Sequence, residues 1–203
     1  MKLYYAPGTI AVAAAITLEE SGLPYTSQRV DFSKGEQLSP AYAAINPKGR
    51  VPALEANGTI LTETGAILDF VAAQAPGLMP TDPLQAAKAR SVMYYLASTM
   101  HVNHAHKLRG ARWADHASSW DDMTAKVPET MAACAAYLEA DCIDGPFVLG
   151  DRFSIADAYL FTVCTWLKGD GVDPTLFPRV QTLMDTMETR ASVKSIRAKG
   201  MLK

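Results

Sequence analysis

The chain has 203 residues, of which 49% are hydrophobic and 20% charged, and its 19 basic and 21 acidic side chains leave a net charge of −2. This apolar content excludes a disordered chain, and the length suits one large domain or two small ones. The small net charge gives no field that favours nucleic acid or an anionic membrane. Every apolar stretch falls short of the roughly 18 to 20 residues needed to span a bilayer.

The first third of the chain alternates between strand and helix patterns. Apolar residues recur at helical spacing over 9–21, and Gly22 follows where a helix C-terminal glycine is typical. Asn57-Gly58, between two β-prone runs, predicts a tight hairpin. In chain order we expect a strand at 3–6, a helix at 9–21, a strand at 25–30, a loop with a short helix at 31–46, strands at 51–56 and 59–62, and a helix at 63–74. This order predicts two parallel strands extended by an antiparallel hairpin.

A proline-rich stretch separates this part from an all-helical remainder. Residues 75–83 contain three prolines and no periodicity, which is typical of a linker. Beyond it we expect helices at 84–109, 116–141, 154–168, 175–190 and 192–199, with Pro128 kinking or breaking the second. The sequence therefore predicts an α/β domain over 1–77 and an all-α domain over 84–203.

The cysteines and the N-terminus indicate the cellular compartment. Cys134, Cys142 and Cys164 are too few and too far apart for a disulfide framework or a Cys-x-x-Cys pair. Their apolar surroundings indicate reduced thiols in a core. The first residues lack the pattern of a secretory signal. We therefore expect a cytoplasmic protein.

A first candidate site is the Val51-Pro52 step. Proline inside a run that otherwise reads as a strand removes a donor from the sheet. It is tolerated at an edge, or where a cis peptide turns the backbone toward a ligand. A ligand peptide can then pair with Val51 as an added strand. A plain edge-strand proline is the alternative.

A second candidate is Thr62-Glu63-Thr64, at the start of a predicted helix. The unpaired N–H groups and the dipole there favour an anion, and the Thr64 hydroxyl adds a donor for a carboxylate. Glu63 can take an ammonium group, so the set suits an α-amino acid head group. Ordinary N-capping by Thr62 or Thr64 is the alternative.

The third candidate is the strand-to-helix turn over 7–11. A helix N-terminus favours an anionic group such as a thiolate. Thr9 is also a possible N-cap, and Tyr5, on the strand just before, is a possible core residue.

These sites occur together in one family. The chain resembles a glutathione S-transferase, nearest the bacterial beta class, over almost its whole length. The resemblance rests on Met1-Lys2-Leu3-Tyr4-Tyr5-x-Pro7-Gly8, Ile16-Thr17-Leu18-Glu19-Glu20-Ser21-Gly22, Asn46-Pro47-Lys48-Gly49-Arg50-Val51-Pro52-Ala53-Leu54, Leu61-Thr62-Glu63 and Phe153-Ser154-Ile155-Ala156-Asp157-Ala158-Tyr159-Leu160-Phe161. It implies a thioredoxin-like N-terminal domain, an all-helical C-terminal domain that holds the electrophile pocket, and a homodimer.

The resemblance also implies roles for single residues. Val51 would hold the cysteinyl backbone of glutathione, with Pro52 in the cis form. Glu63 and Thr64 would bind the γ-glutamyl end, and Lys34 would reach the glycyl carboxylate. The buried capping box Ser154-x-x-Asp157 would serve folding rather than catalysis.

One departure concerns the reacting sulfur. Beta-class members carry a cysteine at the position of Ile10, so this chain forms no mixed disulfide with glutathione there. The candidate donors to a bound thiolate are the Thr9 hydroxyl first, the Tyr5 hydroxyl second, and the backbone N–H groups of Ile10 and Ala11.

Histidines form the last candidate. His101 aligns with a histidine near the substrate site of beta-class relatives. His101 and His104 share a helix face, but His106 points about 140° away at 100° per residue. With no carboxylate or cysteine at helical spacing nearby, the pattern does not favour a metal site.

The resemblance implies an enzyme that adds the glutathione thiolate to a small electrophile. Two alternatives remain open: a glutathione-binding or interaction module of the same fold with little catalysis, and a glutathione-dependent peroxidase or dehalogenase. The sequence leaves open the identity of the electrophile and the group that activates the thiol.

Overall fold

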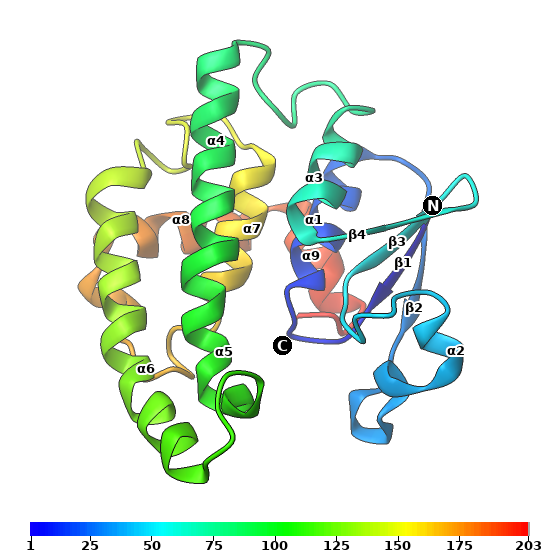
Figure 1. Ribbon diagram of the computed structural model, residues 1–203. Coiled ribbons are helices and arrows are strands. Elements are labelled where there is room, and N and C mark those ends of the chain that lie inside the picture. The colour runs from blue at the N-terminus through cyan, green and yellow to red at the C-terminus, as the bar shows by residue number, and fades with distance from the viewer. Residues whose placement is uncertain (203) are drawn as a thin grey trace. The chain divides into compact units, whose positions relative to one another are not determined.

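The computed structural model describes residues 1 to 202, which form two compact units. The first contains Met1–Thr81 and the stretch from Glu188 onward, and the second contains Asp82–Met187. The elements of the first unit are β1 Lys2–Tyr5, α1 Ala11–Ser21, β2 Thr26–Arg29, α2 Pro40–Ala43, β3 Ala53–Ala56, β4 Thr59–Thr62, α3 Thr64–Ala72 and α9 Ala191–Ala198 (Figure 1). The fold is the expected one, a thioredoxin-like α/β arrangement in the first part of the chain followed by helices.

The four strands form one mixed sheet in the order β2-β1-β3-β4. β1 runs parallel to β2 and antiparallel to β3, and β3 pairs antiparallel with β4. The predicted hairpin is confirmed, since Asn57 and Gly58 have φ values of 50° and 77°, both in the left-handed region that a two-residue turn needs. The predicted parallel pair and antiparallel hairpin are therefore both present.

Helix α1 fills the centre of the first unit. Its residues from Ala11 to Leu18 are all buried, and most of them are small, so neighbouring backbones approach closely. It contacts β1, α3 and α9, and the expected Gly22 ends it in the left-handed conformation. Figure 1 shows α1 and α3 on one side of the sheet and α2 on the other. There, Tyr42 of α2 packs edge-on against Tyr4, with ring centroids 6.1 Å apart.

The second unit is helical. Its helices are α4 Pro83–Tyr95, α5 His101–Arg109, α6 Ala117–Tyr137, α7 Ile155–Cys164 and α8 Pro178–Thr189, the last two residues of which group with the first unit. The single helix expected at 84–109 contains a π-helical segment, Leu96–Met100. Pro128 lies inside α6 without ending it. All three cysteines are unpaired and buried. No helix within residues 1–202 is long and apolar enough to cross a membrane.

The expected capping box at the start of α7 is present. The buried Asp157 carboxylate accepts hydrogen bonds from the Ser154 N–H at 2.7 Å and the Ser154 hydroxyl at 3.0 Å. Its second oxygen accepts from the Val148 N–H at 2.7 Å, which ties the preceding loop to the helix. These contacts are structural, as the resemblance implied.

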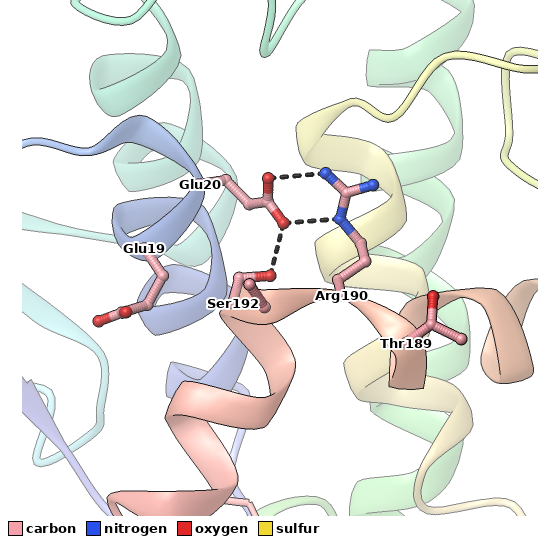
Figure 2. A pocket seen from close by; sticks show the side chains of 6 residues that line it. Glu19, Glu20, Thr189, Arg190 and Ser192 are labelled. Atoms are coloured by element: carbon pink, nitrogen blue, oxygen red, sulfur yellow. Dashed lines mark hydrogen bonds and ion pairs between the residues drawn. The ribbon is translucent and has the colours of Figure 1, made fainter.

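An ion pair fixes α9 to α1. Arg190 donates from Nε and a terminal nitrogen to the two Glu20 oxygens at 2.6 and 2.7 Å, and the Ser192 hydroxyl donates to the same carboxylate at 2.5 Å (Figure 2). These residues line a surface pocket with Glu19, Thr189 and Ala191. Because α9 packs on α1, the stretch from Glu188 groups with the first unit, whereas the expected division assigned all of 84–203 to the helical domain.

This ion pair predicts an acid-sensitive contribution to stability. Burial desolvates Glu20, but the hydrogen bonds from Arg190 and Ser192 outweigh that effect and hold the pKa below its ordinary 4.5. The carboxylate therefore stabilises the fold above about pH 4.5, and the contribution is lost as the pH falls through the lowered value. We expect Glu20→Gln to cost about 2 kcal/mol at pH 7, with the difference from wild type shrinking at acid pH, as measured by urea unfolding.

Glu129→Gln is the matched control. Glu129 pairs with Lys126 at 2.6 Å, but both side chains are largely exposed, so the change should have little effect on stability. Equal losses in the two variants would contradict the assignment.

Candidate functional site

The fold orients the Val51 peptide but leaves the backbone N–H and C=O of Val51 without hydrogen-bond partners among the described residues. The Arg50 carbonyl accepts from the Tyr42 hydroxyl at 2.8 Å and from the Asn46 side-chain amide at 2.7 Å. In a trans peptide the N–H points opposite to the C=O, so these bonds direct the Val51 N–H to the other side. Neither the N–H nor the C=O of Val51 has a partner within residues 1–202. The Val51-Pro52 bond is cis, as expected.

Tyr42 is a residue that sequence reasoning missed. Burial raises the pKa of its hydroxyl to about 12, so at neutral pH the group keeps the proton that it donates to the Arg50 carbonyl. A bond between a side chain and a backbone carbonyl eight residues away has no sequence pattern of its own. The one sequence feature that could have indicated this bond is an aromatic residue placed shortly before the Asn46-Pro47 turn.

The start of α3 is open as well. No side chain caps the helix, so the structure does not have the capping by Thr62 or Thr64 that was the alternative. The Thr62 hydroxyl instead accepts from Lys48 Nζ at 2.8 Å, and the Thr64 hydroxyl has no partner in the described part of the chain. Glu63, just before the helix, has a φ of 70°, a strained value for a residue with a Cβ. The first backbone N–H groups of an α-helix have no partner within the helix.

Lys48 is a second residue that sequence reasoning missed. Its ammonium lies 2.5 Å from Glu63 Oε1, with both side chains partly exposed. The strand register explains the contact, because Ala53 pairs with Thr62 and so brings the turn before β3 next to the end of β4. The proximity of Lys48 and Glu63 could have been predicted from the hairpin, because its register sets which residues face each other.

In the turn that leads into α1, the Thr9 hydroxyl is hydrogen-bonded within residues 1–202 while two other candidate donors are not. The Thr9 hydroxyl donates to the Ala6 carbonyl at 2.7 Å, and its oxygen accepts weakly from the Ala11 N–H at 3.4 Å. The Thr9 hydroxyl proton is therefore already donated to the Ala6 carbonyl. By contrast, the Ile10 N–H and the Tyr5 hydroxyl have no hydrogen-bond partner among the described residues.

Strand pairing brings most of the predicted site residues to one edge of the sheet. Tyr4 pairs with Ala53, and Ala53 pairs with Thr62. The carboxyl end of β1, the amino end of β3 and the carboxyl end of β4 therefore meet, which gathers Tyr5, Thr9, Ile10, Val51, Pro52, Glu63 and Thr64. Lys34 follows β2 at the same edge, where its exposed side chain lies 3.7 Å from Asp31.

His101 lies in the second unit, on α5. Its ring centroid is 5.0 Å from that of Trp166, whose other neighbour, His104, stacks at 4.2 Å. His104 Nδ1 lies 2.6 Å from the buried Asp170 carboxylate. His101, His104 and Trp166 thus form one aromatic cluster within the second unit.

Two family models match the chain. The glutathione S-transferase N-terminal domain matches residues 1–73, and the C-terminal domain matches residues 111–186. Glutathione S-transferase GstA of Escherichia coli O157:H7 is 31% identical over 207 residues, covering 99% of this chain and 100% of the relative.

Solved structures are similar over the same length. A glutathione transferase homologue from Sulfitobacter, with bound glutathione, is 63% identical with a TM-score of 0.98 and covers 99% of this chain and 98% of that one. The bacterial beta-class glutathione S-transferase of Sphingomonas chungbukensis is 28% identical with a TM-score of 0.85, covering 99% of this chain and all of its own. This chain therefore belongs to the glutathione S-transferase family.

Proposed function

We propose that this protein is a glutathione transferase that binds glutathione at the edge of its sheet and adds the thiolate to a small electrophile. The observation that carries the proposal is the unpaired Val51 N–H and C=O beside the uncapped start of α3. The N–H and C=O of Val51 can pair with a peptide backbone, and the start of α3 can bind an amino-acid head group next to it. The 63% identical relative with bound glutathione supports the choice of ligand.

The γ-glutamyl end fits the start of α3. Its carboxylate would accept from the Thr64 hydroxyl and the first backbone N–H groups, where the helix dipole favours negative charge. Its ammonium would pair with Glu63 in place of Lys48 Nζ, which lies beside that carboxylate in this structure. The cysteinyl backbone would pair with Val51 as an added strand, with Pro52 adjoining, and the glycyl carboxylate would lie near Lys34.

Donors at the start of α1 would stabilise the thiolate. An ordinary thiol pKa near 8.5 is about 1 to 2 units too high for full ionisation at neutral pH, and each unit corresponds to about 1.4 kcal/mol. One charge-assisted hydrogen bond, worth about 1.5 to 3 kcal/mol, nearly suffices. The Ile10 N–H and the Tyr5 hydroxyl are open for this purpose, whereas the Thr9 hydroxyl must first leave the Ala6 carbonyl. We therefore rank the Ile10 N–H and Tyr5 ahead of Thr9.

We propose a beta-class enzyme in which Ile10 replaces the usual cysteine, acting as a homodimer in the cytoplasm. The beta-class relative from Sphingomonas chungbukensis supports the class. His101 would line the electrophile pocket of the helical domain.

The activity itself can be measured with a model electrophile. The protein should bind to glutathione-agarose and conjugate glutathione to chlorodinitrobenzene, with a rate that rises with pH as the bound thiol ionises. Retention without turnover of any electrophile in a broad panel would contradict the transferase proposal.

Glu63→Gln and Thr64→Ala test how the γ-glutamyl end is bound. Each change removes one partner of a charged group, so isothermal titration calorimetry should show glutathione binding weakened roughly tenfold in each. Thr64→Ser, which keeps the hydroxyl, should bind like wild type. Glu55→Gln changes a carboxylate on β3 outside the proposed site and is the control. Unchanged affinity in both site variants would rule out this assignment.

Tyr42→Phe tests whether the hydrogen bond from the Tyr42 hydroxyl to the Arg50 carbonyl orients the Val51 N–H. The change removes one of two bonds to the Arg50 carbonyl without touching the ligand. If losing this hydrogen bond costs about 1 kcal/mol of binding free energy, glutathione should bind about fivefold more weakly in the same titration. Tyr94→Phe, an exposed hydroxyl change on α4, should bind like wild type. If Tyr42→Phe also binds like wild type, the Arg50 carbonyl does not orient Val51.

A further inference from the structure

The last residues of the chain return to the turn at the start of α1. The Gly8 N–H donates to the Met201 carbonyl at 2.9 Å, and Figure 1 shows the C-terminal end beside the first helix. Met201 and Leu202 are 2% and 6% exposed, so these residues are packed into the first unit. We call Gly200, Met201 and Leu202 the C-terminal hook.

The geometry of the hook is set by the end of α9. Gly200 has a φ of 68°, its N–H donates to the Arg197 carbonyl at 2.9 Å, and the Met201 N–H donates to the Ile196 carbonyl at 3.1 Å. This pair of bonds is a Schellman motif, in which the glycine reverses the chain and the next residue packs back on the helix. The motif directs the Met201 carbonyl away from α9, toward Gly8.

Helix α9 is in turn fixed to the far end of α1. Glu20 accepts from Arg190 and Ser192 at the start of α9. Glu19 accepts from Lys199 Nζ at 2.5 Å just after α9 ends. One C-terminal segment therefore holds both ends of α1, the far end by ion pairs and the start by a backbone hydrogen bond.

The turn that the hook contacts at Gly8 contains the Ile10 N–H, one of the proposed donors to the thiolate. Gly8 has a φ of 69°, and the Thr9 N–H reaches the Ala6 carbonyl only at 3.4 Å, so the turn's internal backbone bond is weak. The bond to Met201 fixes the Gly8 peptide plane two residues before the Ile10 N–H. Donors stabilise a developing charge best when they are oriented before it forms.

We propose that the C-terminal hook is a positioning element that orients the start of α1 toward the glutathione thiolate. The inference rests on the proposed function. The hook touches neither the sulfur nor the electrophile, so it acts through Gly8 and not as a catalytic group.

The test compares the full chain with a chain ending at Gly200. The matched control ends at Leu202 and keeps the whole hook. For each protein, the absorbance of the bound thiolate near 240 nm is titrated against pH, and kcat and the KM for glutathione are measured with chlorodinitrobenzene. We expect removal of Met201 and Leu202 to raise the pKa of the bound thiol by about one unit. It should lower kcat about tenfold below that pKa, with little loss well above it and less than about twofold change in KM.

Gly200→Ala provides a second variant in case the shortened chain does not fold. It keeps every contact group but strains the left-handed position that aims the hook. The same rise in the thiol pKa, of smaller size, is expected.

A folded variant with the wild-type thiol pKa and kcat profile would overturn the inference while leaving the proposed function intact. A wild-type protein that binds glutathione without forming thiolate would contradict the proposed thiolate activation and the inference with it. An equal fall in kcat at all pH values would mark the hook as merely structural.

Discussion

Two side-chain hydrogen bonds to the Arg50 carbonyl orient the peptide on which the candidate site depends. Backbone groups can recognise a peptide only if the fold leaves them unpaired, and an unpaired backbone group is costly unless water or a ligand satisfies it. Tyr42 and Asn46 bind the carbonyl of this peptide, so the Val51 N–H points to the side opposite to them. The rest of the site is arranged around that edge by the pairing of β1, β3 and β4.

Charge acts locally in this protein. The net charge of −2 provides no long-range field, yet carboxylates and cations are placed at particular points. Glu63 and Lys48 stand at the start of α3, and Glu19 and Glu20 stand at the end of α1, where the helix dipole disfavours them. The cations of the C-terminal segment compensate for that placement and so couple the end of the chain to the first helix.

Local features of the fold could be predicted from the sequence. The Asn57-Gly58 hairpin, the Gly22 helix end and the Asp157 capping box each depend on a few adjacent residues whose conformational preferences agree with the final structure. Pro128 shows the limit, because it lies within a helix that its intrinsic preference would interrupt. The π-helical Leu96–Met100 segment has no distinct sequence pattern either.

The parts of the site that sequence reasoning missed are contacts between distant residues. Lys48 reaches Glu63 through the strand register, Tyr42 reaches the Arg50 carbonyl from α2, and Met201 reaches Gly8 from the other end of the chain. The family resemblance supplied Lys34 and His101, which composition and spacing alone did not indicate. It also drew attention to Ile10, the position at which the resemblance implies a cysteine.

The decisive experiment is a crystal structure of the protein with bound glutathione. We expect the cysteinyl backbone to pair with the Val51 N–H and C=O, and the sulfur to lie within hydrogen-bond distance of the Ile10 N–H or the Tyr5 hydroxyl. Glutathione bound away from Val51, or a sulfur that meets neither of these donors, would contradict this expectation.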